Sequence, residues 1–329
     1  MIFYTISFIL INMIIYLKRE FLINKYNVYD LPDQTRKNHK VKIAVFGGVI
    51  IQINLIFLLL FILFSDVEFP NIIKNNRNLF SIFFISLCVF LTGMFDDKLL
   101  IQNKTKFLTL SALVFLTISI DQGFVLTSIK FSWMNREILT LGFSTLFTAL
   151  CILTFMNSFN FMDGVDLLCG IYALFIFIIF FYLTKSLFFL PFIFSLILFC
   201  FLNYKKITFF GDSGALLISF LISLFIIKIY KLNLIYTEQI LILFLIPILD
   251  NMRVFYKRFI NKQNILIPDN DHLHHILFKK FNLLITLIIV LGLIIVPSII
   301  SVLTNQFFYI LMFFQIALYL MTILRFQKK

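Results

Sequence analysis

Residues 43–64 read IAVFGGVIIQINLIFLLLFILF, and this stretch contains no charged residue. An apolar run of about 20 residues is long enough to cross the hydrocarbon core of a bilayer as one helix. Similar runs recur along the whole chain, which is 61% hydrophobic and only 13% charged. No soluble core could bury so much apolar surface. The composition therefore predicts an all-α, polytopic integral membrane protein.

We expect about 10–11 transmembrane helices, separated by short polar breaks. The predicted spans are 2–17, 43–64, 79–95, 107–120, 138–156, 167–184, 187–202, 213–230, 238–256, 281–304 and 306–324. Two boundaries are narrow, because Lys185 alone separates one pair of spans and Asn305-Gln306 separates the last pair. The first run lacks a basic start and a small-residue cleavage site, so we interpret it as a membrane helix and not a cleaved signal.

The charged residues predict an orientation in the membrane. Of the 28 Lys and Arg residues, 21 fall on one side of the predicted spans. By the positive-inside rule that side is cytoplasmic, which places the N-terminus outside. All four histidines and most of the acids lie on the same side, which a rule about Lys and Arg does not explain. We therefore expect one domain, 1–329, whose function resides in the cytoplasmic loops 18–42, 96–106, 157–166, 203–212 and 251–280.

The net charge of +12 suggests an anionic partner. Membrane lipid and an anionic substrate both fit, whereas nucleic acid does not, because no soluble basic domain is predicted. The four cysteines lie in or beside apolar runs without a CxxC pair, so packing explains them better than a disulfide or a metal site.

Two adjacent carboxylates, Asp96 and Asp97, follow the third span in Gly93-Met94-Phe95-Asp96-Asp97-Lys98. They repel each other unless a cation or a proton lies near them. A solvated helix end is the alternative reading. Lys106 follows closely and could neutralise phosphate groups.

Polar residues recur at every third position in the next motif, at Asn157, Asn160, Asp163 and Asp166. On a helix this spacing keeps the four side chains on one face. Such a face suits a metal, a sugar or a nucleobase, which need carboxylate acceptors and amide donors together. An exposed helix end is the weaker alternative.

Gly211-Asp212-Ser213-Gly214 predicts a tight turn that opens a helix. A helix N-terminus favours anions, and Asp212 could hold a magnesium ion that bridges phosphates. The simpler alternative is that Asp212 or Ser213 is only an N-cap.

Three histidines follow in the loop Pro268-Asp269-Asn270-Asp271-His272-Leu273-His274-His275. We favour binding of a phosphate or pyrophosphate by these imidazoles over zinc, because no thiolate is near and adjacent histidines rarely share one ion. A basic loop near the N-terminus, Arg36-Lys37-Asn38-His39, precedes Gly47-Gly48 and by itself suggests contact with lipid.

Taken together, the motifs place Asp groups for a magnesium ion and cations for phosphate oxygens on one membrane face, which are the parts of phosphoryl transfer. In kind and order they resemble the polyprenyl-phosphate N-acetylhexosamine-1-phosphate transferase superfamily (glycosyltransferase family 4), over nearly the whole chain. The histidine loop resembles the undecaprenyl-phosphate GlcNAc-1-phosphate transferases and O-antigen initiating enzymes. The peptidoglycan branch, which transfers phospho-MurNAc-pentapeptide, is the alternative.

The resemblance implies transfer of a sugar 1-phosphate from a UDP-sugar to undecaprenyl phosphate, with release of UMP, at the cytoplasmic face of a bacterial inner membrane. It implies Mg²⁺, with Mn²⁺ as an alternative, and is compatible with a homodimer. Asp212 and Asp97 would hold the metal. The catalytic candidates are Asp96, Asp97, Asp163 and His272. The substrate-binding candidates are His39, Lys106, Asn157, Asn160, Asp166, His274 and His275.

The chain departs from the family pattern at three places. Leu167 stands where the family often has glycine, Ala215 follows Gly214 where serine is usual, and no proline precedes Gly47-Gly48. None of these departures removes a charged group. The rival functions are a secondary transporter, which would place its acids near the membrane midplane, and an inactive family member that acts as a scaffold.

Overall fold

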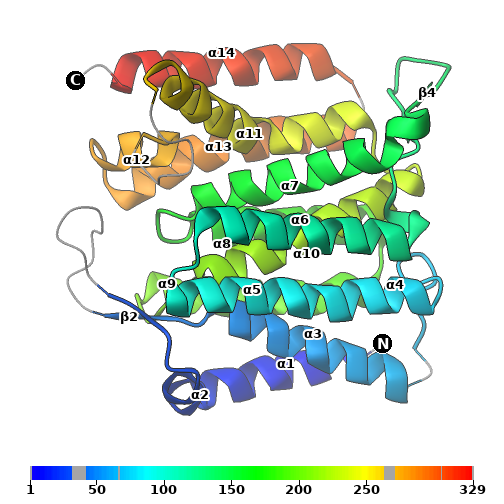
Figure 1. The fold of residues 1–329 in the computed structure, drawn as a ribbon, viewed down its shortest axis with the longest axis vertical. Helices are drawn as coiled ribbons and strands as arrows, with labels where there is room; N and C mark the ends of the chain where they lie inside the picture. The colour runs from blue at the N-terminus through cyan, green and yellow to red at the C-terminus, as the bar shows by residue number, and fades with distance from the viewer. Residues whose placement is uncertain (1, 32–41, 66, 263–270, 305, 328–329) are drawn as a thin grey trace.

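The computed structural model describes residues 2–31, 42–65, 67–262, 271–304 and 306–327. A helix overlaps each predicted span, and the long helices lie side by side in one bundle (Figure 1). The long helices are α1 (Ile2–Leu17), α3 (Gly47–Phe64), α5 (Ser86–Leu99), α6 (Asn103–Ile120), α7 (Ser144–Met162), α8 (Leu168–Thr184), α9 (Leu190–Tyr204), α10 (Gly211–Lys231), α11 (Thr237–Ile260), α13 (Leu283–Thr304) and α14 (Phe308–Gln327). A short helix, α4 (Asn76–Phe80), leads into α5 through a π-turn at Ser81–Ile85.

Eight helical segments among the described residues are long and apolar enough to cross a membrane, and α1 and α8 are shorter apolar helices. The predicted class, an all-α polytopic membrane protein, is therefore confirmed. The narrow boundary at Lys185 is also real, because this residue ends α8 in the left-handed conformation with a φ of 52°. Helix α1 begins and α14 ends at opposite ends of the bundle (Figure 1).

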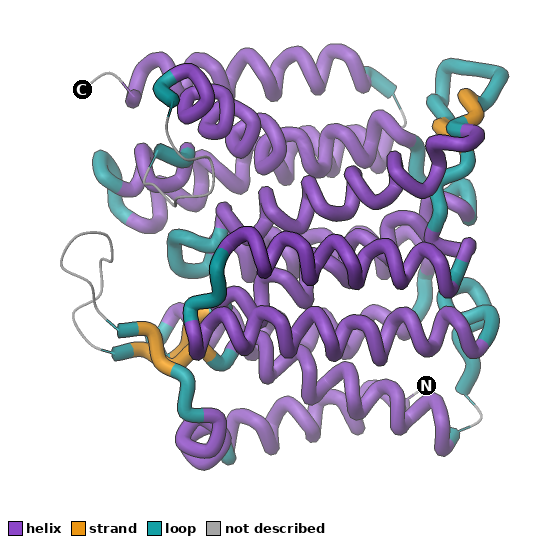
Figure 2. The backbone as a smooth tube through the Cα atoms, in the orientation of Figure 1, coloured by secondary structure: helices purple, strands orange, loops and turns teal. Residues whose placement is uncertain are grey.

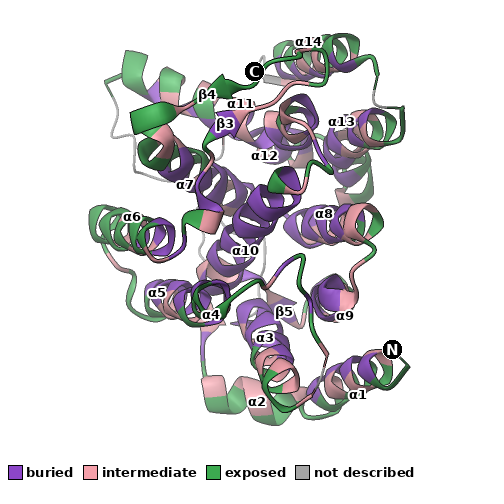
Figure 3. Ribbon diagram, turned by 90° about the vertical axis from the view of Figure 1, so that its right-hand side faces the viewer, coloured by how far each residue is buried: buried purple, intermediate pink, exposed green. Residues whose placement is uncertain are grey.

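Helix α10 forms the centre of the bundle. Every residue from Ser213 to Tyr230 is buried, and α3, α5, α7 and α8 pack around it (Figure 3). A helix enclosed in this way needs apolar side chains on all its faces, and α10 has them. Its N-terminus therefore opens inside a ring of other helices.

Short strands lie at the two ends of the bundle, as Figure 2 shows. At one end β2 (Ile43–Val45) pairs antiparallel with β1 (Tyr29–Asp30) and parallel with β5 (Thr208–Phe209). The first turn of α10 lies at this end, which we call the motif end. At the opposite end β3 (Ser128–Ile129) pairs with β4 (Ile138–Leu139).

Two predicted spans begin too early. The segment 43–64 becomes helical only at Gly47, because 43–45 pair with the neighbouring strands. The segment 138–156 begins with β4, and its helix α7 is shifted to Ser144–Met162.

The prediction that four polar residues share one face of a helix is wrong, because α7 ends before the last two of them. Asn157 and Asn160 lie on α7, whereas Asp163 ends the helix with a ψ of 60° and Asp166 lies in the following turn.

A buried polar cluster at the opposite end was not predicted. The Lys228 ammonium on α10 donates to Asn78 Oδ1 at 2.5 Å, and the Asn78 amide donates to Asp121. Asp121 also accepts the backbone N–H of Gly123 at 2.7 Å. These bonds satisfy a cation within the most buried helix, which would otherwise be strongly destabilising.

Short helices complete the motif end. They are α2 (Arg19–Tyr26), which follows α1, and α12 (Leu273–Phe278), which carries two of the three clustered histidines.

Candidate active site

The first turn of α10 is capped by a carboxylate from another helix. Asp97 on α5 accepts the backbone N–H of Asp212 at 2.9 Å and that of Ser213 at 3.0 Å. The α10 N-cap residue, Phe210, supplies no side-chain bond of its own. The sequence predicts that this helix N-terminus favours an anion, and the Asp97 carboxylate is that anion. It accepts hydrogen bonds from otherwise unpaired N–H groups and interacts favourably with the positive end of the helix dipole. The same hydrogen bonds hold the backbone of Asp212 beside Asp97.

Gly93 permits this approach of α5 to α10. A Cβ atom at this position would lie 2.6 Å from the Asp212 carbonyl oxygen and 2.6 Å from the Ser213 nitrogen. Any side chain would separate the two backbones and lengthen the bonds from α10 to Asp97. The glycine that begins the sequence motif is therefore required for packing.

Lys106, in the first turn of α6, joins two carboxylates. Its ammonium lies 2.8 Å from Asp96 Oδ2 and forms an ion pair with Asp212. The side chains of Lys106, Asp96 and Asp212 are 13%, 11% and 28% exposed, so Asp212 presents the more accessible of the two carboxylates. The lysine offsets part of the repulsion between carboxylates that meet from separate helices.

Asp163 brings a further carboxylate to the same place. Burial, together with the negative charges of Asp212, Asp97 and Asp166, raises its pKa to about 8, against a hydrogen bond from the Gly211 N–H that favours the ionised form. Asn160, one turn earlier, lies within hydrogen-bonding reach of Asp212. At neutral pH, Asp163 therefore holds a proton that a cation could displace.

The histidine loop approaches this cluster at Gly164. A Cβ on Gly164 would lie 2.6 Å from His275 Nε2 and 2.8 Å from His274 Nε2, so the bare backbone lets the imidazoles come close. Burial lowers the pKa of His274 well below its usual value, and the neighbouring histidines oppose its protonation as well. The His272 ring stacks with Phe161 and with His274, each at a centroid separation of 5.7 Å.

Two of the candidates are not joined to this cluster. Asn157 is half-buried on α7, and no contact links it to the carboxylates among the residues that the structure describes. His39 lies outside the described residues. The remaining candidates, from five segments distant in sequence, meet at the motif end. They are Asp96, Asp97, Lys106, Asn160, Asp163, Asp166, Asp212, His272, His274 and His275.

Sequence reasoning missed the residue that anchors the histidine loop. Asp250, buried inside α11, accepts hydrogen bonds from His272, Arg253 and Tyr319. Asp250 belongs to none of the motifs, but an acid within an apolar run, followed three positions later by an arginine, is a signal that could have identified it.

Leu167 lies in the left-handed conformation with a φ of 68°. This conformation costs an L-residue roughly 1–2 kcal/mol and costs glycine little, which explains why glycine suits the position. The backbone N–H of Leu167 donates to Asn203 at 2.6 Å, which holds the turn in place.

The carboxylates do not form a preassembled metal cage. Among the described residues, no three His, Cys, Asp or Glu side chains have the geometry to hold a metal ion. Backbone N–H groups engage Asp97, and Lys106 engages Asp96 and Asp212. Mg²⁺, however, is usually held by only one or two carboxylates, together with water and substrate phosphates. The chemistry of this donor set fits Mg²⁺ on those terms, with Asp212 and Asp163 as the oxygen donors.

Comparison with known proteins agrees with the motifs. The model of glycosyl transferase family 4 matches residues 79–230, from α4 to the last turn of α10. A probable undecaprenyl-phosphate N-acetylglucosaminyl 1-phosphate transferase of Bacillus subtilis (strain 168) is 27% identical over 197 residues. That match covers 57% of this chain and 54% of the relative, so it spans about half the relative's length. Both matches support the predicted superfamily, and the segment that the family model matches ends before the histidine loop.

Proposed function

We propose that this chain, whose residues 79–230 match glycosyl transferase family 4, transfers a sugar 1-phosphate from a UDP-sugar to undecaprenyl phosphate. The observation that carries the proposal is the convergence of five carboxylates, one lysine and three histidines at one end of a membrane bundle. The phosphate of a lipid acceptor lies at the membrane surface, where that end of the bundle would meet it.

In the proposed reaction an oxygen of the acceptor phosphate forms a bond to the β-phosphorus of the UDP-sugar. The bond from this phosphorus to the bridging oxygen breaks, and UMP leaves with the electron pair. Both reactants are anions that must approach a group of carboxylates, so neutralisation of charge is the main requirement. Bound Mg²⁺ would supply that positive charge and polarise the phosphoryl oxygens.

The residues of the chain have separate tasks in this proposal. Asp97 holds the first turn of α10 so that Asp212 faces the reactants, and Lys106 limits the repulsion between Asp212 and Asp96. Asp163, once ionised, would hold the metal ion as a second oxygen ligand beside Asp212. His272, His274 and His275 approach from the other side of Gly164 to contact the diphosphate or the sugar.

Location and sugar are also part of the proposal. The Lys and Arg distribution supports a cytoplasmic motif end in a bacterial inner membrane, with the N-terminus outside. The histidine loop supports an N-acetylhexosamine as the sugar, and the name of the Bacillus subtilis relative supports undecaprenyl phosphate as the acceptor.

The test is release of UMP by the purified chain from a panel of UDP-N-acetylhexosamines, with Mg²⁺ and undecaprenyl phosphate. We expect turnover with at least one donor, dependent on the lipid phosphate, and none with Asp212→Asn. Glu137→Gln removes a half-exposed carboxylate at the opposite end and is the matched control, which should keep wild-type turnover. No UMP with any donor would refute the proposal.

A further inference from the structure

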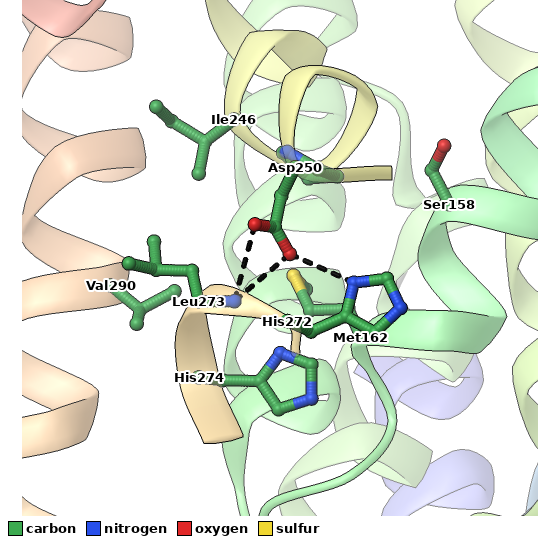
Figure 4. A pocket seen from close by; sticks show the side chains of 9 residues that line it. Ser158, Met162, Ile246, Asp250, His272, Leu273, His274 and Val290 are labelled. Atoms are coloured by element: carbon green, nitrogen blue, oxygen red, sulfur yellow. Dashed lines mark hydrogen bonds and ion pairs between the residues drawn. The ribbon is translucent and has the colours of Figure 1, made fainter. Parts of the chain in front are cut away.

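Asp250 lies at the centre of a buried hydrogen-bond network beside the histidine loop. It is 6% exposed. Its Oδ2 accepts from His272 Nδ1 at 2.9 Å, and its Oδ1 accepts from Arg253 Nη2 at 2.8 Å and from the Tyr319 hydroxyl at 3.0 Å. The Leu273 backbone N–H donates to both oxygens, at 3.1 and 3.0 Å (Figure 4). The network joins α11, α12 and α14.

These contacts determine where the His272 proton lies. A carboxylate that receives four donor groups is ionised and can only accept, so His272 Nδ1 must carry the hydrogen. The Nε2 atom is then the ring nitrogen that remains to meet a ligand. Stacking with Phe161 and His274 fixes the plane of the ring.

Asp250 has no room to touch a substrate itself. The cavity beside it, lined by residues that include Ser158, Met162 and His272, has a volume of about 10 Å³ (Figure 4). This volume admits roughly one water molecule. Any effect of Asp250 on the reaction must therefore pass through a neighbour. His272 is as buried as Asp250, at 5% exposed, but it stacks on His274, which lies against Gly164, and so it links Asp250 to the carboxylate cluster.

We propose that Asp250 is a positioning residue, which fixes the tautomer and orientation of His272 so that Nε2 is the atom presented to the diphosphate or sugar of the donor. The inference rests on the proposed function, because it assigns His272 to the binding of that substrate. At metal-bound histidines, removal of the group that holds the other ring N–H typically changes affinity or activity by roughly 10–100-fold, and we expect an effect of the same size here.

A double-mutant cycle separates this role from a purely structural one. In the UMP-release assay we expect Asp250→Asn to lower kcat/KM by roughly 10–100-fold in the wild-type background and by less than about threefold in the His272→Ala background. Tyr319→Phe removes one donor from the same carboxylate but leaves the His272 contact, and should keep turnover within about threefold. Equal losses from Asp250→Asn in both backgrounds, wild-type activity in His272→Ala, or a loss in Tyr319→Phe as large as that in Asp250→Asn would overturn the proposal.

A second measurement does not depend on activity. The chain has only four histidines, so ¹⁵N-histidine NMR of the wild-type protein in detergent can resolve them, and the signal lost in His272→Ala identifies His272. We expect a protonated Nδ1 in the wild-type protein. A bare Nδ1 with a protonated Nε2 would overturn the inference. Failure of the wild-type protein to release UMP would instead count against the proposed function.

Discussion

Substitution of Gly164 by alanine tests whether the histidine loop and the carboxylate cluster form one site. The added Cβ would lie 2.6 Å from both Cε1 and Nε2 of His275 and 2.8 Å from His274 Nε2, where ordinary contacts are 3.4–4 Å. The imidazoles must therefore move by about 1 Å. A displacement of that size in a catalytic site costs about 100-fold in rate, or roughly 2.7 kcal/mol of transition-state stabilisation.

The assay is UMP release, measured over a range of UDP-sugar concentrations for Gly164→Ala beside Gly292→Ala. Gly292 lies in α13, and a Cβ there meets nothing within 4 Å, so this control should keep wild-type kinetics. We expect kcat/KM of Gly164→Ala to fall about 100-fold while its melting temperature drops only modestly, because the strain is local. Kinetics within about threefold of wild type would show that the histidines do not act beside Asp163.

Further predictions concern the charges of the site. Lys106→Met should destabilise the protein by about 3 kcal/mol in denaturation experiments, because Asp96 and Asp212 lose the ammonium between them; Asp96→Asn in the same chain should restore part of this loss, and an unchanged stability would contradict the ion-pair argument. The raised pKa of Asp163, about 8 against an ordinary 3.8, means that the folded state binds the proton more tightly than the unfolded state. Its contribution to stability is therefore complete below about pH 4 and is lost as the pH rises through about 8. The melting temperature should fall between pH 6 and pH 9, and less steeply in Asp163→Asn; equal slopes would refute this assignment. Mg²⁺ should raise the melting temperature more at pH 8.5 than at pH 6, since binding requires the ionised carboxylate; equal shifts at the two pH values would speak against Asp163 as a ligand.

The helices were largely predictable because an uncharged apolar run has few alternatives in a membrane. Even the boundary at Lys185 follows from a single charge. The sequence did not predict that residues 43–45 and 138–139 form strands. These residues are apolar, and a short apolar run fits a buried strand as well as a helix, so only its pairing with another strand distinguishes the two.

The site was predictable in composition but not in its connections. Asp97 stands out in sequence as one of two adjacent acids, yet its partners are backbone N–H groups of Asp212 and Ser213, 115 and 116 residues away. No side-chain pattern reports such a bond. Asp250 escaped detection for a related reason, since its role depends on His272, which reaches it from another helix.

The enclosure of α10 has a consequence for how the chain is made. The four helices that surround it, α3, α5, α7 and α8, all precede it in the sequence. During synthesis the N-terminal segments enter the bilayer first. The ribosome therefore delivers the surrounding helices before the one that they enclose, and Asp97 has no helix end to cap until residues 212 and 213 emerge.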